Sequence, residues 1–425
     1  MKVSIRATAS LACLLLSPLP ATAQSPPIAL RASRMLDVVR GEIVRDAVVV
    51  VQDGRIVSVG HGAPPEQARV IDLGDMTLLP GLMDLHTHLA YDLDGDFSAP
   101  VRRTAADYAI RGTRNARRTL LAGFTTVRDV GSTDFVDVAL EHAVEDGLIR
   151  GPRIVPAGYA LGITGGHCDV TGFAPGILEL GPEQGVADGV DEVVRAVRYQ
   201  IKHGAEVIKI CATAGVLSFE GSVGAQQYSE AEMRAIVQEA ARHGVKVAAH
   251  AHGTEGIMAA VRAGVASIEH GSILSDEAIR LMKEHGTYLV PTTYLMDVID
   301  LDILPPLIRA KAESVIPLAI ESHRRAIAAG VKLAFGTDAA VYPHGDNGRE
   351  FAALVRRGMS PLAAIRSATV AAADLLGVED RGIIEPGRLA DLVAVPGNPL
   401  EDIDVMADVR FVMIGGEVVK RPEGD

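Results

Sequence analysis

Two histidines, His86 and His88, lie one residue apart at the end of a short apolar segment, residues 79–90. If this segment forms a β-strand, side chains at positions i and i+2 point to the same side, so both imidazoles face one space. Imidazole pairs presented in this way bind zinc and other transition metals. The same spacing also occurs on exposed strands and in loops, so the pattern alone leaves a metal site and a surface pair as alternatives.

Polar residues also end several later apolar segments, and their types suit the same chemistry. A histidine can ligate a metal ion or form a structural hydrogen bond, and an aspartate can ligate, move a proton or cap a helix. Each residue alone fits the structural interpretation, but their repetition favours a shared metal site. The candidate ligands are His86, His88, Lys209, His250, His270 and Asp338.

Lys209 is the only charged residue in the apolar sequence V-I-K-I-C. Burial of an unpaired ammonium costs several kcal/mol or lowers the pKa of the amine. An ammonium has no acceptor and does not ligate a metal, whereas a neutral amine that captured carbon dioxide would become an anionic oxygen ligand able to bridge two ions. A buried lysine paired with an acidic residue is the alternative.

The elements that must position these residues repeat along the middle of the chain. Eight apolar segments predict β-strands, with helical patterns between most of them, at residues 82–89, 125–130, 154–160, 207–212, 245–250, 267–270, 288–292 and 333–338. This order predicts an α/β fold, a (β/α)₈ TIM barrel. The active sites of such barrels lie at the carboxyl ends of the strands, where the candidate ligands occur.

Both ends of the chain combine short β-like runs with tight turns. The Asp53-Gly54 pair between two valine-rich runs predicts a hairpin, and Gly415-Gly416 forms a similar turn near the C-terminus. We therefore expect a small β-sandwich domain formed by both termini. The expected divisions are a signal peptide at 1–23, the N-terminal portion of the β-sandwich at 24–80, a metal-dependent barrel at 81–380 and the C-terminal portion of the β-sandwich at 381–425.

The first residues have the features of a secretory signal. Lys2 and Arg6 precede an apolar stretch at residues 7–16, and Ala21-Thr22-Ala23 fits a small-residue cleavage site. The apolar stretch is too short to span a bilayer. We expect an exported protein, periplasmic or secreted.

Composition and charge limit the class of protein and its partners. The chain has 425 residues, 48% of them hydrophobic, which is enough for one large α/β domain and a smaller one. Removal of Lys2 and Arg6 takes the basic residues from 41 to 39 against 54 acids, so the net charge goes from −13 to −15. Such a surface repels phosphate backbones and anionic lipids, so we expect neither nucleic acid nor membrane as a partner.

Two cysteines, Cys168 and Cys211, remain after the expected signal, and either a disulfide or two buried thiols would fit. Histidines in helical patterns are expected at the surface; these are His142, His203, His243, His285 and His323.

Longer motifs resemble the metal-dependent amidohydrolase superfamily through nearly the whole mature chain. They read P-G-L-M-D-L-H-T-H-L, V-I-K-I, V-A-A-H-A-H-G, S-I-E-H-G-S, G-T-D-A, A-T-x-x-A-A-x-x-L-G and G-x-I-x-P-G-R-L-A-D-L-V. Three more segments, T-G-G-H, Q-Y-S and Y-P-H-G-D-N, are similar to one branch of it. That branch contains Xaa-Pro dipeptidases, related zinc carboxypeptidases and ochratoxin-hydrolysing amidases, and it is also described as imidazolonepropionase-like.

The resemblance implies two zinc ions per chain, bridged by carboxylated Lys209 and a hydroxide. The ligands it implies are His86, His88 and Asp338 for one ion, and His250 and His270 for the other. It also implies a homo-oligomer, for which an octamer is one expected form.

The catalytic residues expected from this resemblance are Asp338, Tyr228 and His167. Asp338 can take a proton from the attacking water and pass it to the leaving nitrogen. The Tyr228 hydroxyl and the His167 imidazole match positions that contact the scissile carbonyl, where they could stabilise an oxyanion. A tyrosine that packs its ring and a histidine bonded to the backbone are the alternatives for these two.

The branch implies a metal-activated hydroxide that cleaves the amide to a C-terminal amino acid. Expected substrates are Xaa-Pro or hydrophobic dipeptides and N-acyl amino acids, with ochratoxin A as one candidate. A substrate carboxylate needs a cation, for which Arg128 and His252 are candidates, although Arg128 could equally pair with Asp129 or with other acids around it. His344 is a further candidate for binding substrate. A cyclic-amide hydrolase of the imidazolonepropionase type and a non-catalytic periplasmic binding protein remain as alternatives.

Overall fold

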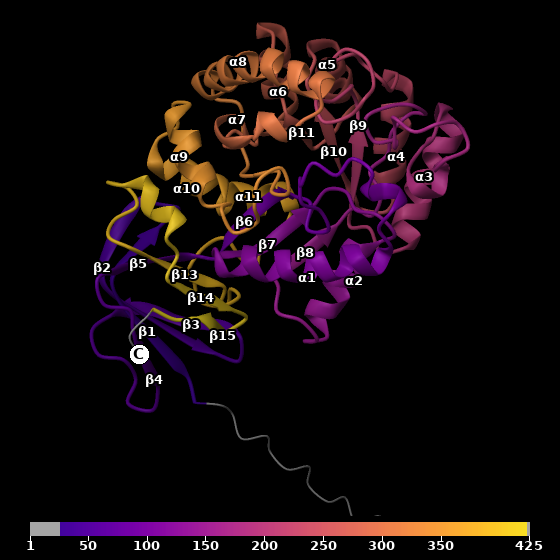
Figure 1. Cartoon of the computed structure of the whole chain (residues 1–425). Coiled ribbons are helices and arrows are strands. Elements are labelled where there is room, and N and C mark those ends of the chain that lie inside the picture. Colours follow the sequence, from indigo (N-terminus) through magenta and orange to yellow (C-terminus); the bar gives the residue numbers. More distant parts are fainter. Residues whose placement is uncertain (1–25, 423–425) are drawn as a thin grey trace, which may run out of the picture.

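The computed structural model describes residues 26–422. The expected signal peptide at residues 1–23 lies outside them. The described chain forms an α/β barrel of the TIM-barrel type, beside which strands from both ends of the chain form a mixed sheet (Figure 1).

Seven of the eight predicted barrel strands are present. They are β6 (Leu82–Thr87), β7 (Phe124–Asp129), β8 (Arg153–Pro156), β9 (Val207–Cys211), β10 (Lys246–Ala251), β11 (Ser267–His270) and β12 (Tyr288–Val290). All neighbouring pairs are parallel, in the orders β6-β7-β8 and β12-β11-β10-β9. A bridge from Leu161 to Ile210 joins the two groups of strands on one side. The strands therefore share one carboxyl edge, as the site requires.

The prediction of a regular eighth strand at residues 333–338 is wrong. This segment lies between β12 and β6 and closes the barrel, but it forms only isolated bridges, Leu333 with Leu289 and Ala339 with Thr87. The backbone N–H of Thr337 donates to the Asp84 carboxylate at 3.1 Å and also to the His86 carbonyl of β6 at 3.4 Å. A side chain thus adds to the backbone contacts at the point where the candidate ligand Asp338 follows.

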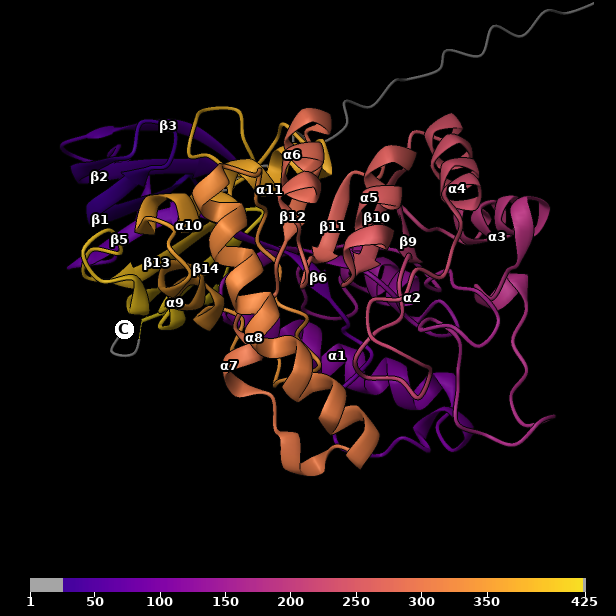
Figure 2. The ribbon, with the colours of Figure 1, turned by 90° about the horizontal axis from the view of Figure 1, so that it is seen from above.

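Helices alternate with the strands and surround the barrel (Figure 2). Several begin at a capping serine or threonine, as at Thr104 and Ser229, where the residue three positions on completes a capping box. The helices are α1 (Ala105–Leu121), α2 (Val136–Glu145), α3 (Gly189–Lys202), α4 (Glu230–Arg242), α5 (Thr254–Ala263), α6 (Asp276–His285), α7 (Leu295–Val298), α8 (Pro306–Ala329), α9 (Arg349–Arg356), α10 (Pro361–Ser367) and α11 (Val370–Leu376), with the short η1 (Ala99–Val101), η2 (Pro182–Gln184), η3 (Leu301–Ile303) and η4 (Ile403–Ala407).

A long connection, residues 157–188, separates β8 from α3 and contains only the short η2. A disulfide joins Cys168 in this connection to Cys211 at the end of β9, with a Cα–Cα distance of 5.9 Å. The structure thus forms the disulfide that the sequence left open, and it attaches the connection to the carboxyl edge of the barrel.

Strands from both termini form one mixed sheet in the order β15-β14-β13-β5-β1-β2-β3, with β4 paired to β1. The hairpins expected at Asp53-Gly54 and Gly415-Gly416 join β2 to β3 and β14 to β15. The strands are β1 (Ile28–Asp37), β2 (Glu42–Gln52), β3 (Arg55–His61), β4 (Arg69–Asp72), β5 (Met76–Pro80), β13 (Leu392–Pro396), β14 (Phe411–Ile414) and β15 (Glu417–Lys420). Hydrogen bonds link them into one continuous sheet built from both termini.

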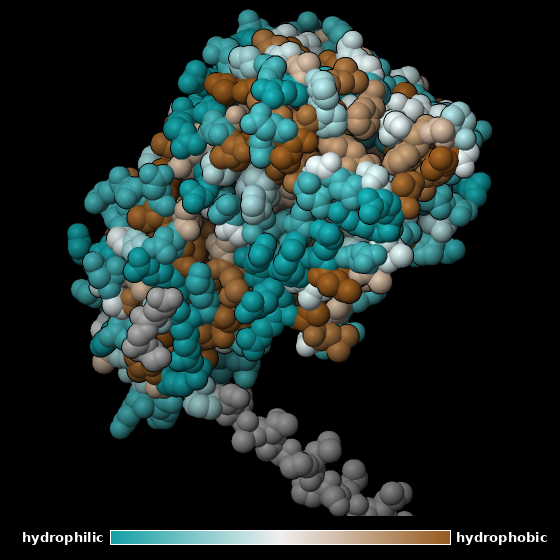
Figure 3. Space-filling view, viewed as in Figure 1, coloured by the Kyte–Doolittle hydropathy of each residue, from teal (hydrophilic) through white to brown (hydrophobic). Residues whose placement is uncertain are grey.

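The sheet and the barrel share buried apolar side chains. Leu79 and Val393 of the sheet pack in one cluster with Leu82 and Phe124 of the barrel. Hydrophilic residues cover much of the face in Figure 3, interrupted by scattered apolar patches. Within residues 26–422, no helix is both long and apolar enough to cross a membrane.

Candidate active site

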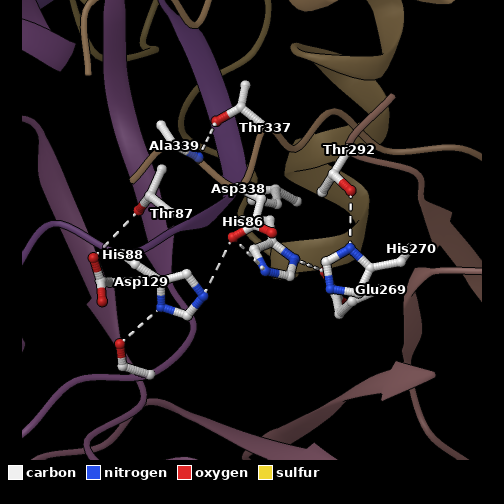
Figure 4. A network of polar contacts seen from close by, with 12 residues as sticks. His86, Thr87, His88, Asp129, Glu269, His270, Thr292, Thr337, Asp338 and Ala339 are labelled. Atoms are coloured by element: carbon white, nitrogen blue, oxygen red, sulfur yellow. Dashed lines mark hydrogen bonds and ion pairs between the residues drawn. The ribbon is translucent and has the colours of Figure 1, made fainter. Parts of the chain in front are cut away.

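His86, His88 and Asp338 meet at the carboxyl edge of the barrel. The Nε2 atoms of His86 and His88 each lie 3.6 Å from Oδ1 of Asp338. Candidate ligand atoms of all three residues lie within 4.8 Å of one another, and Figure 4 shows the three side chains turned toward one another. Two imidazole nitrogens and a carboxylate oxygen at one point form a candidate metal site.

Hydrogen bonds at Nδ1 leave the Nε2 atoms of both histidines available. Nδ1 of His86 lies 2.8 Å from Oε2 of Glu269, and Nδ1 of His88 lies 2.9 Å from the carbonyl oxygen of Gly131. A carboxylate and a carbonyl only accept hydrogen bonds, so Nδ1 carries the proton and Nε2 keeps its lone pair. This tautomer is the one that a metal ion at Nε2 requires.

The electrostatics of the two rings also fit a metal ligand. Burial, together with the nearby charge of Lys209, lowers the pKa of His86 well below its usual range and that of His88 to about 4. Both imidazoles are therefore neutral at pH 7 and can donate a lone pair.

Arg128 does not reach the cavity, and the prediction that it binds a substrate carboxylate is wrong. Its Nε donates to the Leu85 carbonyl at 2.7 Å, Nη1 to Ser267 Oγ at 3.1 Å and Nη2 to Glu269 Oε1 at 2.8 Å. The side chain is only 3% exposed, and that of Glu269 is fully buried. Arg128 is thus the buried partner of the carboxylate that supports His86, since its donors are used inside the barrel.

His250 on β10 and His270 on β11 lie beside this group. Ring centroids are 4.9 Å apart for His86 and His270 and 4.7 Å apart for His250 and His270. Nδ1 of His270 lies 2.9 Å from Oγ1 of Thr292, and that hydroxyl donates to the Pro291 carbonyl. Oγ1 therefore accepts from His270, so Nε2 of this ring is also left with a lone pair.

One buried nitrogen in this group has no partner within residues 26–422. It is Nε2 of His250. Burial lowers the pKa values of His250 and His270 well below the usual range, so both rings are neutral. An unsatisfied buried nitrogen is rare in folded proteins and indicates a missing partner such as an ion. The residues expected to hold a second ion are thus placed where one would fit.

Lys209 points into the same cavity from β9. It is 3% exposed, and its amine has no hydrogen bond or ion pair within the described residues. Burial lowers the pKa of this amine to about 8, against the opposing effect of the Glu269 and Asp338 charges. Part of the lysine is therefore unprotonated near neutral pH, as reaction with carbon dioxide would require.

Three residues at this edge have left-handed backbone conformations without being glycine. They are His270, Thr292 and Asp338, with φ angles of 70°, 48° and 58°. Such conformations cost on the order of 1–3 kcal/mol each and persist where the surroundings hold them. The backbone N–H of Asp338 donates to the His86 carbonyl at 2.7 Å, so one candidate ligand is anchored to the strand of another.

Asp84 holds the peptide that precedes Asp338. Its carboxylate accepts from the Thr337 hydroxyl at 2.6 Å and from Asn347 Nδ2 at 2.8 Å. The Y-P-H-G-D-N segment thus contributes to the site through Asn347. Burial raises the pKa of Asp84 to about 7 and that of Asp338 to about 6, the latter against the charges of Lys209 and His167.

His167 and His252 complete the polar part of the cavity. The ring centroid of His167 lies 4.2 Å from that of His250, and Nδ1 of His167 lies 2.6 Å from Ser218 Oγ. Nδ1 of His252 lies 2.7 Å from Ser272 Oγ, and burial lowers the pKa of His252 to about 3. Both histidines line the cavity.

The candidate ligands lie in a cavity of about 880 Å³. One wall is apolar and comes mainly from α7, α8 and the segment after β9. Its side chains include Val216, Leu217, Leu295, Met296, Ile299, Val315 and Ile316. Arg103 is the only arginine of the described residues in the lining, and it is paired with Asp94 at 2.7 Å and Asp96 at 3.5 Å.

Tyr228 and His344 are not brought to this cavity. Tyr228 is fully buried in an apolar cluster, and its hydroxyl donates to the Ala187 carbonyl at 3.2 Å. A buried tyrosine needs a partner for its hydroxyl, and this carbonyl provides one away from the site. His344 is 3% exposed, with Nδ1 at 3.5 Å from Thr119 Oγ1 and Nε2 at 3.3 Å from the Tyr91 carbonyl. Tyr228 is therefore not placed for the expected catalytic role, and His344 is not placed for the expected substrate contact.

The prediction that His323 lies at the surface is wrong, because it is fully buried in α8. Its Nε2 lies 2.6 Å from the His270 carbonyl, so it holds the left-handed peptide of a candidate ligand. Burial lowers the pKa of His323 to about 4. The sequence contains a signal for this, because Ala319 and Ala326 lie on the same helical face at spacings of four and three residues.

Comparisons with known proteins agree with this geometry. The Amidohydrolase family profile matches residues 77–419. Ochratoxinase from Aspergillus niger is 36% identical over 410 residues, covering 90% of this chain and 84% of that protein. Imidazolonepropionase from Pyrobaculum arsenaticum is a more distant relative, 26% identical over 372 residues, with 83% and 86% covered.

Two solved structures show the same similarity at the level of the fold. A crystal structure of a Xaa-Pro dipeptidase with bound methionine in the active site has 40% identity and a TM-score of 0.90, covering 93% of this chain and all of that chain. A prolidase complexed with N-methylphosphonate-L-proline has 36% identity and a TM-score of 0.83, with the same coverage. The chain is therefore a metal-dependent enzyme of the amidohydrolase family, related to ochratoxinase and to Xaa-Pro dipeptidases.

Proposed function

We propose that this enzyme hydrolyses the amide bond to a C-terminal amino acid, in Xaa-Pro or hydrophobic dipeptides and in N-acyl amino acids such as ochratoxin A. The observation that carries the proposal is the candidate metal site of His86, His88 and Asp338 on the floor of a cavity with an apolar wall. The relatives named for ochratoxin hydrolysis and for Xaa-Pro dipeptide cleavage support the substrate class.

The proposal includes two zinc ions, which a carboxylated Lys209 would help to hold. His250 and His270 would hold the second ion, which is supported by the unpartnered Nε2 of His250 and by the neutral state of both rings. When bound, zinc supplies Lewis acidity to a carbonyl and lowers the pKa of a water.

The protein side chains handle the protons. Asp338 is proposed to accept a proton at its carboxylate from the attacking water and return it to the leaving nitrogen. Burial raises the pKa of Asp338 to about 6, which suits exchange near neutral pH. His167, whose ring faces the cavity, is proposed to donate from Nε2 to the substrate carbonyl oxygen. Tyr228 takes no part, since its hydroxyl is bonded to Ala187.

The cavity walls support an apolar substrate. One face of α8 contributes Ala312, Val315, Ile316 and Ala319, spaced three and four residues apart. Arg128 is paired inside the barrel, so Arg103 is the arginine that would contact a substrate carboxylate. The ion pair between Arg103 and Asp94 would have to open for that contact. His252 remains a candidate substrate contact from the floor.

A substrate panel tests the proposal. Zinc-loaded enzyme should hydrolyse Xaa-Pro and hydrophobic dipeptides, and Asp338→Asn should lower kcat by about 10²-fold or more while its KM changes little. The panel includes ochratoxin A, the C-terminal amides of the best dipeptides, and the cyclic amide imidazolonepropionate. Hydrolysis of the cyclic amide alone would replace this proposal with the imidazolonepropionase-type activity.

We also propose that residues 1–23 direct export and that the enzyme forms a homo-oligomer. The Cys168–Cys211 disulfide supports export, because disulfides persist in oxidising compartments. Fractionation of cells that produce the full chain, followed by determination of the mature N-terminus, tests the export, and light scattering of the purified enzyme tests the assembly.

A further inference from the structure

A buried carboxylate that the proposed reaction does not use lies beside His167, one of the residues that line the cavity. It belongs to Glu220, whose side chain is 7% exposed. Oε1 accepts the backbone N–H of Gly215 at 2.9 Å and lies 3.5 Å from Nδ1 of His167. Oε2 is buried without a hydrogen-bond partner among the described residues. A carboxylate held in this way is costly to bury, so its position calls for a function.

A buried lysine holds the same turn from the other side. Lys311 of α8 is 8% exposed, and its Nζ donates to the carbonyls of Gly215 at 3.1 Å and Ser218 at 2.8 Å. The same Nζ lies 4.0 Å from Oε2 of Glu220. Lys311 and Glu220 therefore fix the turn at residues 215–220 as one charged unit.

The same turn packs against the His167 ring. Ser218 Oγ lies 2.6 Å from Nδ1 of His167. Gly215 lies flat against the ring, where an added Cβ would overlap ring atoms. The His167 backbone N–H donates to Gln227 Oε1 at 3.1 Å, and the neighbouring Cys168 is fixed by its disulfide to Cys211.

The ionisation of Glu220 agrees with this arrangement. Burial raises its pKa, but hydrogen bonding with His167, Ser218 and Gly215 outweighs burial and holds the pKa of Glu220 at about 2. The Nδ1 edge of the His167 ring thus faces a fixed negative charge. Nε2, on the other side of Cε1, has no partner within residues 26–422 and is left to contact a ligand.

We propose that Glu220 and Lys311 are positioning residues that fix the orientation of the His167 ring, so that its Nε2 faces the carbonyl of the substrate. This inference rests on the proposed function, in which His167 donates to that carbonyl. A donor that is already oriented acts more strongly in the transition state than in the ground state, so loss of the orientation lowers kcat more than it raises KM.

A double-mutant cycle tests the coupling in zinc-loaded enzyme with its best dipeptide. Glu220→Gln should lower kcat by about 10-fold with KM changed less than about twofold, and it should change kcat less than about twofold when His167→Gln is already present. Glu183→Gln is the matched control, because Glu183 pairs at the surface with Arg195 at 3.0 Å and is 46% exposed. Equal losses in both backgrounds would show that Glu220 acts only through the general fold.

A second readout does not depend on turnover. In protein labelled with ¹⁵N-histidine, long-range proton–nitrogen spectra report the hydrogen bonding and the surroundings of each ring nitrogen. The His167 signals, assigned with His167→Gln, should change in Glu220→Gln and in Lys311→Met but not in Glu183→Gln. If no amide is hydrolysed, the proposed function fails and these spectra still decide the inference. Unchanged His167 signals in both variants would overturn it.

Discussion

At the scale of single residues, the site depends on buried groups that set the proton positions of the candidate ligands. The Arg128–Glu269 pair lies behind His86, and the Gly131 carbonyl lies behind His88, so both rings keep Nε2 unprotonated. Such supporting partners fix the ring orientation and raise the basicity of the ligand. Lys209 differs from these groups because its amine has no partner within the described residues.

Lys209 gives a prediction at this scale. If it works as a carbamate, Lys209→Ala should lose bound zinc and nearly all activity, and short carboxylates added to the solution should restore part of both. Lys209→Arg should not be restored, since a guanidinium cannot ligate and would fill the space. Lys202→Ala on α3 is the control. A Lys209→Ala variant with unchanged zinc content and kcat would show that Lys209 is only a packed residue of the barrel.

At the scale of elements, the carboxyl edge of the barrel is assembled from segments that are not regular. The segment after β12 closes the barrel through isolated backbone bridges and a hydrogen bond to the Asp84 side chain, and the connection after β8 carries His167. The Cys168–Cys211 disulfide attaches that connection to β9, two residues beyond Lys209.

The disulfide should therefore contribute to both stability and activity. Replacement of Cys168 and Cys211 together by serine should lower the free energy of unfolding by about 2–4 kcal/mol, because the open connection gains freedom in the unfolded chain. Denaturant unfolding measures this, and kcat should fall as His167 loses one of its attachments. A non-chelating phosphine reductant should reproduce the effect in the wild type but not in the double variant. Equal midpoints for the wild type and the double variant would contradict the prediction.

At the scale of the whole molecule, the fold follows from patterns that are local in sequence. Alternating apolar segments and helices predict a parallel barrel, and parallel strands share one edge, so His86, His88 and Asp338 could be predicted to meet. The spacing of residues on a strand does not tell which buried partner a side chain finds. The sequence therefore suggests that Arg128 is a cation of the cavity. In the structure its guanidinium instead pairs with Glu269, the single acid of a buried strand. Tyr228 was misplaced for a similar reason, because a backbone carbonyl distant in sequence accepts its hydroxyl.

The central claim is that catalysis depends on metal ions held by this chain, and a zinc titration tests it most directly. Protein freed of metal by a chelator, verified by elemental analysis, is titrated with zinc while hydrolysis of the best dipeptide is measured. We predict no activity without zinc, and full activity at about two ions per chain. The melting temperature should rise in parallel, since an ion that binds only the folded state stabilises it. Full activity in the verified metal-free protein would contradict the account.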